Sequence, residues 1–344
     1  MLSIQLDTIV QNAGVSACEK GKHWGWAVGL LHNAKLTGLR PDAVTANAAA
    51  SACEKGRRWE AALVVLEEAP QDAIAAEVVT YNAGISACEK AAAWPSALAL
   101  LRAMRRARLE PDALARNAGI SACEKGRRWR CAFDLLAAMR LESARPDEVT
   151  CAGLVSACEK CGCWEQAIQV LASLAVTEQQ PDLFTFSAAV SACEKAHKWE
   201  WALQILTSMR LHRVLPDIIA YSAVISACEK CQQWQQSLGI LAEMRQLAIW
   251  PSIISYSAAI SACEKAMQWE QAFALLKAAG DQRLHPDTVM YTAALGACSA
   301  GRQWGRALEL LEGMQRGTLR PDLRAASAAL DALAGTWRGA LAAL

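Results

Sequence analysis

A cysteine returns every 35 residues along most of this 344-residue chain, and that interval constrains the fold more than any other feature. In eight of nine copies the cysteine lies in the block S-A-C-E-K, and a tryptophan always follows six residues later. A period of 20–50 residues is typical of stacked supersecondary units rather than of a domain with one central site. The cysteines are Cys18, Cys53, Cys88, Cys123, Cys158, Cys193, Cys228, Cys263 and Cys298. The tryptophans are Trp24, Trp59, Trp94, Trp129, Trp164, Trp199, Trp234, Trp269 and Trp304.

The period predicts one continuous domain of nine tandem repeats over residues 8–322. Residues 1–7 form a short N-terminal lead-in. Residues 323–344 begin a tenth repeat but lose the Cys-Glu-Lys, so we expect a degenerate tenth repeat that serves as a C-terminal capping helix. Its apolar end, residues 339–344, is expected to pack on the ninth repeat. The repeats are 8–42, 43–77, 78–112, 113–147, 148–182, 183–217, 218–252, 253–287 and 288–322.

One repeat, residues 78–112, predicts two helices. The first runs from Thr80 to about Ala91, with Thr80 as its N-cap. The second starts at Trp94 and places apolar residues at helical spacing through Met104. Equivalent N-caps are predicted at Thr45, Thr150, Thr185 and Ser255, and C-terminal glycines of the first helix at Gly21, Gly56, Gly126 and Gly301.

A Pro-Asp pair ends most repeats and breaks the second helix. Each repeat is therefore a helix-turn-helix hairpin that is too small to bury its own apolar face. Stacking supplies the missing partner, and the predicted fold is all-α, a right-handed α-solenoid superhelix of such hairpins. The pairs are Pro41-Asp42, Pro111-Asp112, Pro146-Asp147, Pro181-Asp182, Pro216-Asp217, Pro286-Asp287 and Pro321-Asp322.

The fourteen cysteines favour neither disulfides nor a metal site. Nine of them recur at one place in the repeat, where we expect small buried hydrophobes, and the nine spaced tryptophans are expected to fill the spaces between hairpins. A redox or stacking role is the alternative. The pairs Cys158/Cys161 and Cys228/Cys231 lie two repeats apart, which does not suit a four-ligand zinc site. We expect no metal, no cofactor and a reducing compartment.

No membrane span, targeting signal or catalytic constellation is evident in the sequence. The uncharged stretch 246–263 is interrupted by Pro251, and residues 1–7 resemble neither a signal nor a transit peptide. Either the protein is cytosolic, or a targeting segment is missing from this sequence. The five histidines occupy unrelated repeat positions, so they build no shared site. The chain is predicted not to be an enzyme.

A 35-residue hairpin that opens on Val79-Thr80-Tyr81-Asn82 and closes on Pro111-Asp112 resembles the P-type repeat of the pentatricopeptide repeat family. The resemblance covers residues 8–322, although a tryptophan in the S-A-C-E-K-x-x-x-W core is unusual. It implies a monomeric, sequence-specific protein that reads single-stranded RNA at one base per repeat. It also implies a mitochondrial or chloroplast location and a role in RNA processing, stabilisation, editing or translation, with RNA-processing proteins as further partners.

In this family the fifth residue of a repeat reads a base and the last residue supports it. By position, these pairs are Asn12/Asp42, Asn47/Glu77, Asn82/Asp112, Asn117/Asp147, Ala152/Asp182, Ser187/Asp217, Ser222/Ser252, Ser257/Asp287 and Thr292/Asp322. The resemblance assigns uracil to Asn with Asp and guanine to Thr or Ser with Asp. Asn47/Glu77 is expected to take a pyrimidine and Ala152 any base, while Ser222/Ser252 has no assignment. The expected target is 5′-U-Y-U-U-N-G-N-G-G-3′.

The second residue of a repeat in this family sits between successive bases. All nine equivalents in this chain are apolar: Ile9, Val44, Val79, Leu114, Val149, Phe184, Ile219, Ile254 and Val289. The alternative is that these side chains pack on the neighbouring hairpin.

The lysine after the glutamate is expected, from the resemblance, to contact phosphate. These lysines are Lys20, Lys55, Lys90, Lys125, Lys160, Lys195, Lys230 and Lys265. Each has a glutamate beside it, and the net charge of the chain is only +1, low for a nucleic-acid binder. A solvated charged stripe is the simpler interpretation. Near-neutral charge also favours the rival function, a protein-binding helical-repeat scaffold, although a peptide surface has less reason to restrict the fifth residue to Asn, Ser, Thr and Ala.

Overall fold

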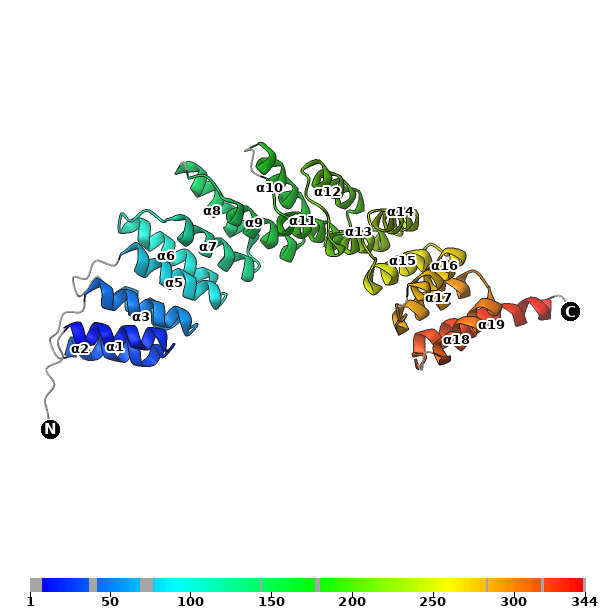
Figure 1. Ribbon diagram of the computed structural model, residues 1–344, viewed down its shortest axis with the longest axis horizontal. Helices are drawn as coiled ribbons and strands as arrows, with labels where there is room; N and C mark the ends of the chain where they lie inside the picture. The colour runs from blue at the N-terminus through cyan, green and yellow to red at the C-terminus, as the bar shows by residue number, and fades with distance from the viewer. Residues whose placement is uncertain are drawn as a thin grey trace. The chain divides into compact units, whose positions relative to one another are not determined.

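The computed structural model describes residues 8–36, 42–68, 77–142, 144–176, 180–282, 284–316 and 319–342, with the side chains of residues 8, 35–36, 68, 175–176 and 333–342 excepted. The lead-in 1–7, Pro41 and the side chains at the apolar C-terminal end lie outside these residues. Within them every regular element is a helix. The chain divides into two compact parts, Met1–Cys161 and Gly162–Leu344, so that the fifth repeat contributes one helix to each. Figure 1 labels the helices in chain order.

The helices alternate between the first and second helices of successive repeats. In the first part they are α1 (Thr8–Lys20), α2 (Trp24–Leu36), α3 (Ala43–Lys55), α4 (Trp59–Glu68), α5 (Val78–Lys90), α6 (Trp94–Arg106), α7 (Ala113–Lys125), α8 (Trp129–Leu141) and α9 (Glu148–Cys161). In the second part they are α10 (Trp164–Val176), α11 (Leu183–Lys195), α12 (Trp199–Leu211), α13 (Ile218–Lys230), α14 (Trp234–Gln246), α15 (Ile253–Lys265), α16 (Trp269–Asp281), α17 (Thr288–Ala300), α18 (Trp304–Arg316) and α19 (Leu323–Ala342).

Each part is a run of stacked helical hairpins, which makes the fold an all-α helical-repeat solenoid. Successive first helices pack on one another, as α1, α3, α5, α7 and α9 do in the first part and α11, α13, α15, α17 and α19 in the second. Within each part, a second helix packs on the first helix of its own hairpin and on that of the next, as α6 does on α5 and α7 and α12 on α11 and α13. The ninth hairpin is covered by α19, which contacts both α17 and α18.

Small residues in the first helices allow this close stacking. Alanines and the repeated cysteine face the neighbouring helices, and Ala122 and Cys123 are fully buried, as are their equivalents in most repeats. Burial raises the pKa of the Cys123 thiol to about 12, so this thiol stays protonated and acts as a small apolar group. Ile85, Met104 and Ile120 fill the remaining space between first and second helices.

The expected N-caps were wrong by three residues. The first helices are capped by the last residue of the preceding repeat, and the carboxylate of Asp112 accepts the backbone N–H of Ala115 at 2.8 Å. Aspartate accepts this bond better than the threonine two or three residues into the helix, because the cap must stand before the first turn. Asp42, Asp182, Asp217, Ser252 and Asp287 cap the following helices in the same way.

The predicted C-terminal glycines do end the first helix, but for a different reason than expected. Gly126 has φ −79°, and the left-handed residue is the next one, Arg127, with φ 54°. A Cβ on Gly126 would lie 2.3 Å from Cδ1 of Trp94 in the preceding repeat. The glycine is therefore needed for packing against the tryptophan, on which Arg128 also stacks at 5.1 Å from the ring centroid.

The described residues also bear on the expectations about membrane spans, disulfides and metal sites. None of the helices there combines the length and apolar character that crossing a bilayer needs. The fourteen cysteines are free thiols. In the same ranges, no group of three or more His, Cys, Asp or Glu residues is arranged to hold a metal ion.

Candidate nucleic-acid interface

The fifth and last residues of a repeat meet as hydrogen-bonded pairs in the first four repeats. The amide nitrogen Nδ2 of Asn12 donates to Asp42 at 2.9 Å, and that of Asn82 donates to Asp112 at 2.8 Å. In the fourth repeat Asn117 donates to both oxygens of Asp147, at 2.9 and 3.2 Å. The second repeat has the longer contact from Asn47 to Glu77, 3.4 Å. In the three repeats with aspartate, one carboxylate thus caps the next helix and orients the asparagine, whereas Glu77 makes no such cap.

The pKa values of two of these carboxylates, Asp42 and Asp147, are held below the usual value by their hydrogen bonds. Partial burial alone would raise the pKa of Asp42, but hydrogen bonds from Thr45 and Asn12 outweigh it and hold the pKa below its usual value. The pKa of Asp147 is lowered in the same way, because bonds from Thr150 and Asn117 outweigh the effect of burial. An ionised carboxylate can only accept hydrogen bonds, so it fixes which end of the asparagine amide faces it.

In the second part the fifth residues are hydroxyl-bearing and their contacts differ from repeat to repeat. Thr292 donates to the carbonyl of Thr288 in its own helix at 2.6 Å and lies 3.4 Å from Asp322. Ser222 shares a hydrogen bond with Ser255 at 2.8 Å, and Ser255 lies 3.1 Å from Ser252. The Oγ of Ser187 is buried without a hydrogen-bond partner among the described residues.

All nine second residues are exposed, which disagrees with the alternative that they pack on the neighbouring hairpin. Their exposed fractions run from 55% at Val289 to 74% at Ile9. They lie in the first turn of each first helix, three residues before the fifth residue, and side chains three apart share one face of a helix. Each repeat therefore presents an exposed apolar side chain beside its fifth residue.

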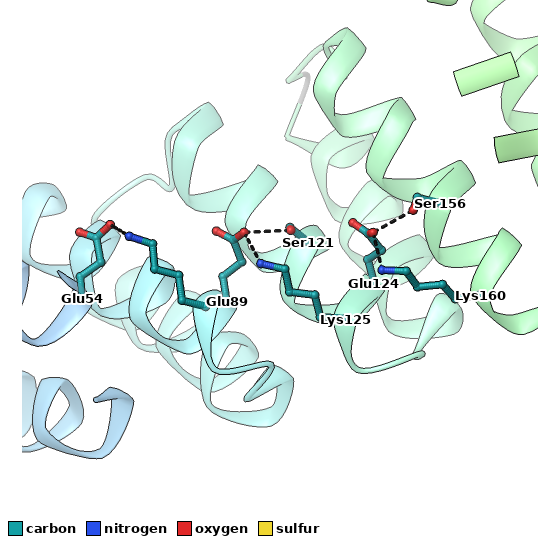
Figure 2. A network of polar contacts seen from close by, with 8 residues as sticks. Glu54, Glu89, Ser121, Glu124, Lys125, Ser156 and Lys160 are labelled. Atoms are coloured by element: carbon teal, nitrogen blue, oxygen red, sulfur yellow. Dashed lines mark hydrogen bonds and ion pairs between the residues drawn. The ribbon is translucent and has the colours of Figure 1, made fainter. Parts of the chain in front are cut away.

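Most of the repeated lysines form ion pairs with the glutamate of the preceding repeat. We call this series the ion-pair ladder, and its N–O distances are 2.8–3.0 Å. Serines of the S-A-C-E-K block also donate to it, as Ser121 does to Glu89 at 3.0 Å and Ser156 to Glu124 at 2.8 Å. Figure 2 shows the ladder from Glu54 to Lys160. The pairs are Lys55–Glu19, Lys90–Glu54, Lys125–Glu89, Lys160–Glu124, Lys230–Glu194 and Lys265–Glu229.

The ladder lies away from the fifth and last residues. A lysine is eight residues beyond the fifth residue on the same helix, which corresponds to about 12 Å along the axis. The Lys125 side chain is 39% exposed, so part of it remains open to solvent beside the glutamate. The sequence shows the glutamate next to the lysine, but the partner is the glutamate 36 residues earlier.

The ladder changes at Glu264, because the ninth repeat has Gly296 where the serine would stand and Ala300 in place of the lysine. The carboxylate of Glu264 lies over Gly296, where a Cβ would be 2.3 Å from Oε1. Burial raises the pKa of Glu264, whereas a hydrogen bond from Lys55 is the main cause that lowers the pKa of Glu19. The final glutamate is therefore in an unfavourable place for a charge.

Replacing Glu264 with glutamine is expected to raise the melting temperature at pH 7. A carboxyl group whose pKa is raised by folding stabilises the fold fully below its unfolded pKa, and that contribution is lost as the pH rises through the folded pKa. The gain should therefore vanish at about pH 3, well below the ordinary glutamate pKa, where the carboxyl group is protonated in both states. Differential scanning calorimetry at the two pH values measures this.

The matched control is Glu229→Gln, which removes the carboxylate partner of Lys265. This variant is expected to be less stable than the wild type at pH 7, by about 0.2–1 kcal/mol. If Glu264→Gln and Glu229→Gln lower the melting temperature equally, the two glutamates are in equivalent environments and the assignment to Glu264 is wrong.

The sequence pattern does not reveal the part that the third residue of the repeat plays in the site. The hydroxyls of Thr45, Thr80 and Thr150, which are predicted as helix caps, each donate to the fifth residue of the preceding repeat. A second missed position is the fourth residue, tyrosine in several repeats and arginine in the fourth. There Arg116 and Arg105 both pair with Glu142, at 3.0 and 2.8 Å. A short polar residue recurring before the fifth position was the available signal.

Comparison with known proteins agrees with the repeat pattern. The family model described as the pentacotripeptide-repeat region of PRORP matches residues 113–252, the pentatricopeptide repeat domain matches residues 29–91, and the PPR repeat matches residues 254–278 and 289–317. No curated protein sequence matches the chain.

Solved structures with the same fold include the pentatricopeptide repeat protein PPR10 from maize, at 22% identity and a TM-score of 0.71. The match covers 95% of this chain and 46% of PPR10, so the chain spans about half the length of that protein. The PPR domain of Arabidopsis thaliana protein-only RNase P 1 in complex with tRNA matches at 18% identity and a TM-score of 0.44, covering 49% of this chain and 89% of that one. The family models and the shared solenoid fold together place this chain in the pentatricopeptide repeat family.

Proposed function

We propose that the protein binds single-stranded RNA in a sequence-specific manner, with one nucleotide at each repeat. The observation that carries this proposal is the exposure of all nine apolar second residues beside the fifth residues. Unstacked bases are recognised by side chains that cover their faces together with side chains that hydrogen-bond their edges. Each repeat except the fifth, which has Ala152 at the base-reading position, presents one side chain for each task. Membership of the pentatricopeptide repeat family supports the same ligand.

The specificity proposed for each repeat follows from the pairs of fifth and last residues. Asn12/Asp42, Asn82/Asp112 and Asn117/Asp147 are assigned uracil, and Thr292/Asp322 is assigned guanine. The full proposed target is 5′-U-Y-U-U-N-G-N-G-G-3′. Selection from a random RNA pool followed by sequencing tests it. Enrichment of a U-rich 5′ half and a G-rich 3′ half is expected, and selected RNAs without that asymmetry would remove the proposal.

The cellular role is proposed from the family alone. It comprises processing, stabilisation, editing or translation of RNA in a mitochondrion or chloroplast, by a monomer that works with RNA-processing proteins and is not itself a catalyst. RNA crosslinking in cells, followed by sequencing, identifies both the target and the compartment from which it comes.

The affinity for RNA is expected to depend only weakly on salt. Eight lysines that each neutralise one phosphate would give a slope of about −5.6 in a plot of log K against log salt concentration. Most of these lysines already have a carboxylate at 2.8–3.0 Å, which reduces their attraction for phosphate. We therefore expect a slope less than half as steep as that. Fluorescence anisotropy between about 50 and 400 mM salt measures the slope. A slope near −5.6 would show that RNA displaces the glutamates from the lysines.

A protein-binding function remains the second candidate, favoured by one observation. A cavity of about 430 Å³ is lined mainly by apolar residues of α10 and α12, among them Ile168, Leu171, Trp201 and Ile205. RNA binding by the second residues does not involve this cavity. A protein that fails to enrich any RNA but captures apolar peptides would favour the scaffold.

A further inference from the structure

The third residue of the following repeat completes the hydrogen bonding of the fifth residue. In the fourth repeat the hydroxyl of Thr150 lies 2.6 Å from the amide oxygen Oδ1 of Asn117 and 2.6 Å from Asp147. Thr45 contacts Asn12, and Thr80 contacts Asn47, through the same pair of atoms. These threonines are at most 1% exposed. A buried hydroxyl from the next repeat thus holds the oxygen of the base-reading amide.

Four fifth residues are followed by a repeat without this hydroxyl, where Ala115, Ala220, Met290 or Ala325 stands instead, and two of the four leave a buried polar atom without a partner among the described residues. Ala115 follows Asn82, whose Oδ1 is buried and unpartnered among the described residues. Ala220 follows Ser187, whose Oγ is in the same condition. In the seventh repeat Ser255 supplies the hydroxyl and satisfies Ser222 at 2.8 Å. Among the four asparagine repeats, the hydroxyl therefore separates Asn12, Asn47 and Asn117, whose amide oxygens are hydrogen-bonded, from Asn82, whose oxygen is not.

The orientation of the Asn82 amide follows from chemistry as well as from the coordinates. Asp112 can only accept, so the nitrogen of Asn82 must face it, at 2.8 Å. The oxygen then faces the side of Ala115, which offers no donor. An unpaired buried acceptor costs free energy, which is recovered only when the amide turns toward a donor.

We propose that the third residue of the following repeat is a positioning residue that sets how strictly the fifth residue distinguishes uracil from cytosine. This inference rests on the proposed RNA-binding function. With the threonine in place, the amide oxygen is engaged, one N–H is held by the aspartate, and an N–H is left to donate to a base. The carbonyl oxygens of uracil accept that bond, whereas cytosine presents an amino group, which also donates.

Without the threonine the asparagine is free to adapt. Turning the amide of Asn82 toward the amino group of a cytosine gives up the bond from Nδ2 to Asp112 but breaks none at the oxygen, whereas the same turn in the first and fourth repeats breaks the bond at the oxygen as well. The third repeat should therefore accept cytosine almost as well as uracil, while the first and fourth repeats, with the same Asn and Asp, should reject it. Preorganisation of the donor is what separates these repeats.

The test compares repeats three and four, which share the Asn/Asp pair and differ at Ala115 and Thr150. Affinity is measured for the target RNA and for versions with cytosine at the third or the fourth nucleotide. For the wild type we expect a loss of about tenfold at the fourth nucleotide and at most about twofold at the third. A cytosine at the fifth nucleotide, opposite Ala152, serves as the neutral control.

Three substitutions then move the effect between repeats. Ala115→Thr is expected to raise the third-nucleotide penalty to about tenfold. Thr150→Val keeps the shape but removes the hydroxyl, and it should abolish the fourth-nucleotide penalty, whereas Thr150→Ser should retain it. Threonine is buried at this place in four other repeats, so the fold accommodates it. Because each penalty is a ratio between two RNAs on one protein, any change in the folded fraction cancels.

The possible results separate the two proposals. A wild-type protein that does not prefer the target over unrelated RNA overturns RNA reading, and the present inference with it. A protein that prefers the target but shows equal penalties at nucleotides three and four, unchanged in all three variants, overturns only the role of the third residue. A larger penalty at the third nucleotide than at the fourth also contradicts it.

Discussion

Replacing Asn117 with threonine is expected to change the preferred base at the fourth nucleotide from uracil to guanine. The variant gives the fourth repeat the Thr/Asp pair present in the ninth, while Asp147 still caps α9. Affinity for the uracil-containing target should fall about tenfold, and affinity for the version with guanine at this position should rise by a similar factor, because one base-edge hydrogen bond is exchanged for another. Competition binding with the two RNAs measures the exchange.

The control for this substitution is the fifth nucleotide. Ala152 has no hydrogen-bonding side chain, so changing that nucleotide should leave the affinity of the wild type and of Asn117→Thr equally unaffected. A variant that loses affinity for both RNAs, with an unchanged melting temperature, would show that Asn117 contributes to binding without reading the base.

Substituting Val79, Leu114 and Val149 with serine is expected to weaken RNA binding by about a hundredfold without lowering stability. Contact between a base and a flat or apolar side chain contributes on the order of 1 kcal/mol per base, so three such losses together give about that factor. The three side chains are 58%, 61% and 64% exposed, so little apolar burial is lost from the folded protein. Isothermal titration and thermal unfolding measure the two effects.

The matched control uses apolar side chains on second helices that are even more exposed. Leu141 in α8 and Leu211 in α12 are 88% and 84% exposed, and their replacement with serine should change neither binding nor stability. If the triple variant unfolds at a lower temperature instead, the second residues support the stacking of hairpins. If it binds RNA normally, bases do not contact them.

The fold was largely predictable because the 35-residue period determines where each helix begins and ends. Cys123 and Trp129 mark the end of one helix and the start of the next, and a strict interval leaves no freedom to place the hairpins elsewhere. The exact caps were not predictable, because Thr45 and Asp42 both carry side chains that can accept a hydrogen bond. Only the backbone path decides that the residue before the first turn does so.

The candidate site was predictable in position but not in its connections. The resemblance located Asn82 and Asp112, yet nothing in the sequence says that Ala115 leaves the Asn82 oxygen unpaired. The partners in the ion-pair ladder were likewise not predictable from the sequence. Lys125 has Glu124 beside it in the sequence, but helix geometry directs the lysine to Glu89 of the repeat before. Contacts that join neighbouring repeats depend on the offset between stacked helices, which the sequence period alone does not determine.

The double use of the last residue has a practical meaning for anyone who rearranges this chain. Asp112 caps α7 while it holds Asn82, and the donor to the fifth residue, where present, also belongs to the following repeat. The working recognition module is therefore offset from the sequence period, running from the second residue of one repeat to the third residue of the next. Grafts cut at repeat boundaries separate the fifth residue from the third residue of the next repeat, which supports it. Grafts cut inside the second helix would keep the fifth residue together with all the residues that hold it, and would therefore transfer its base specificity.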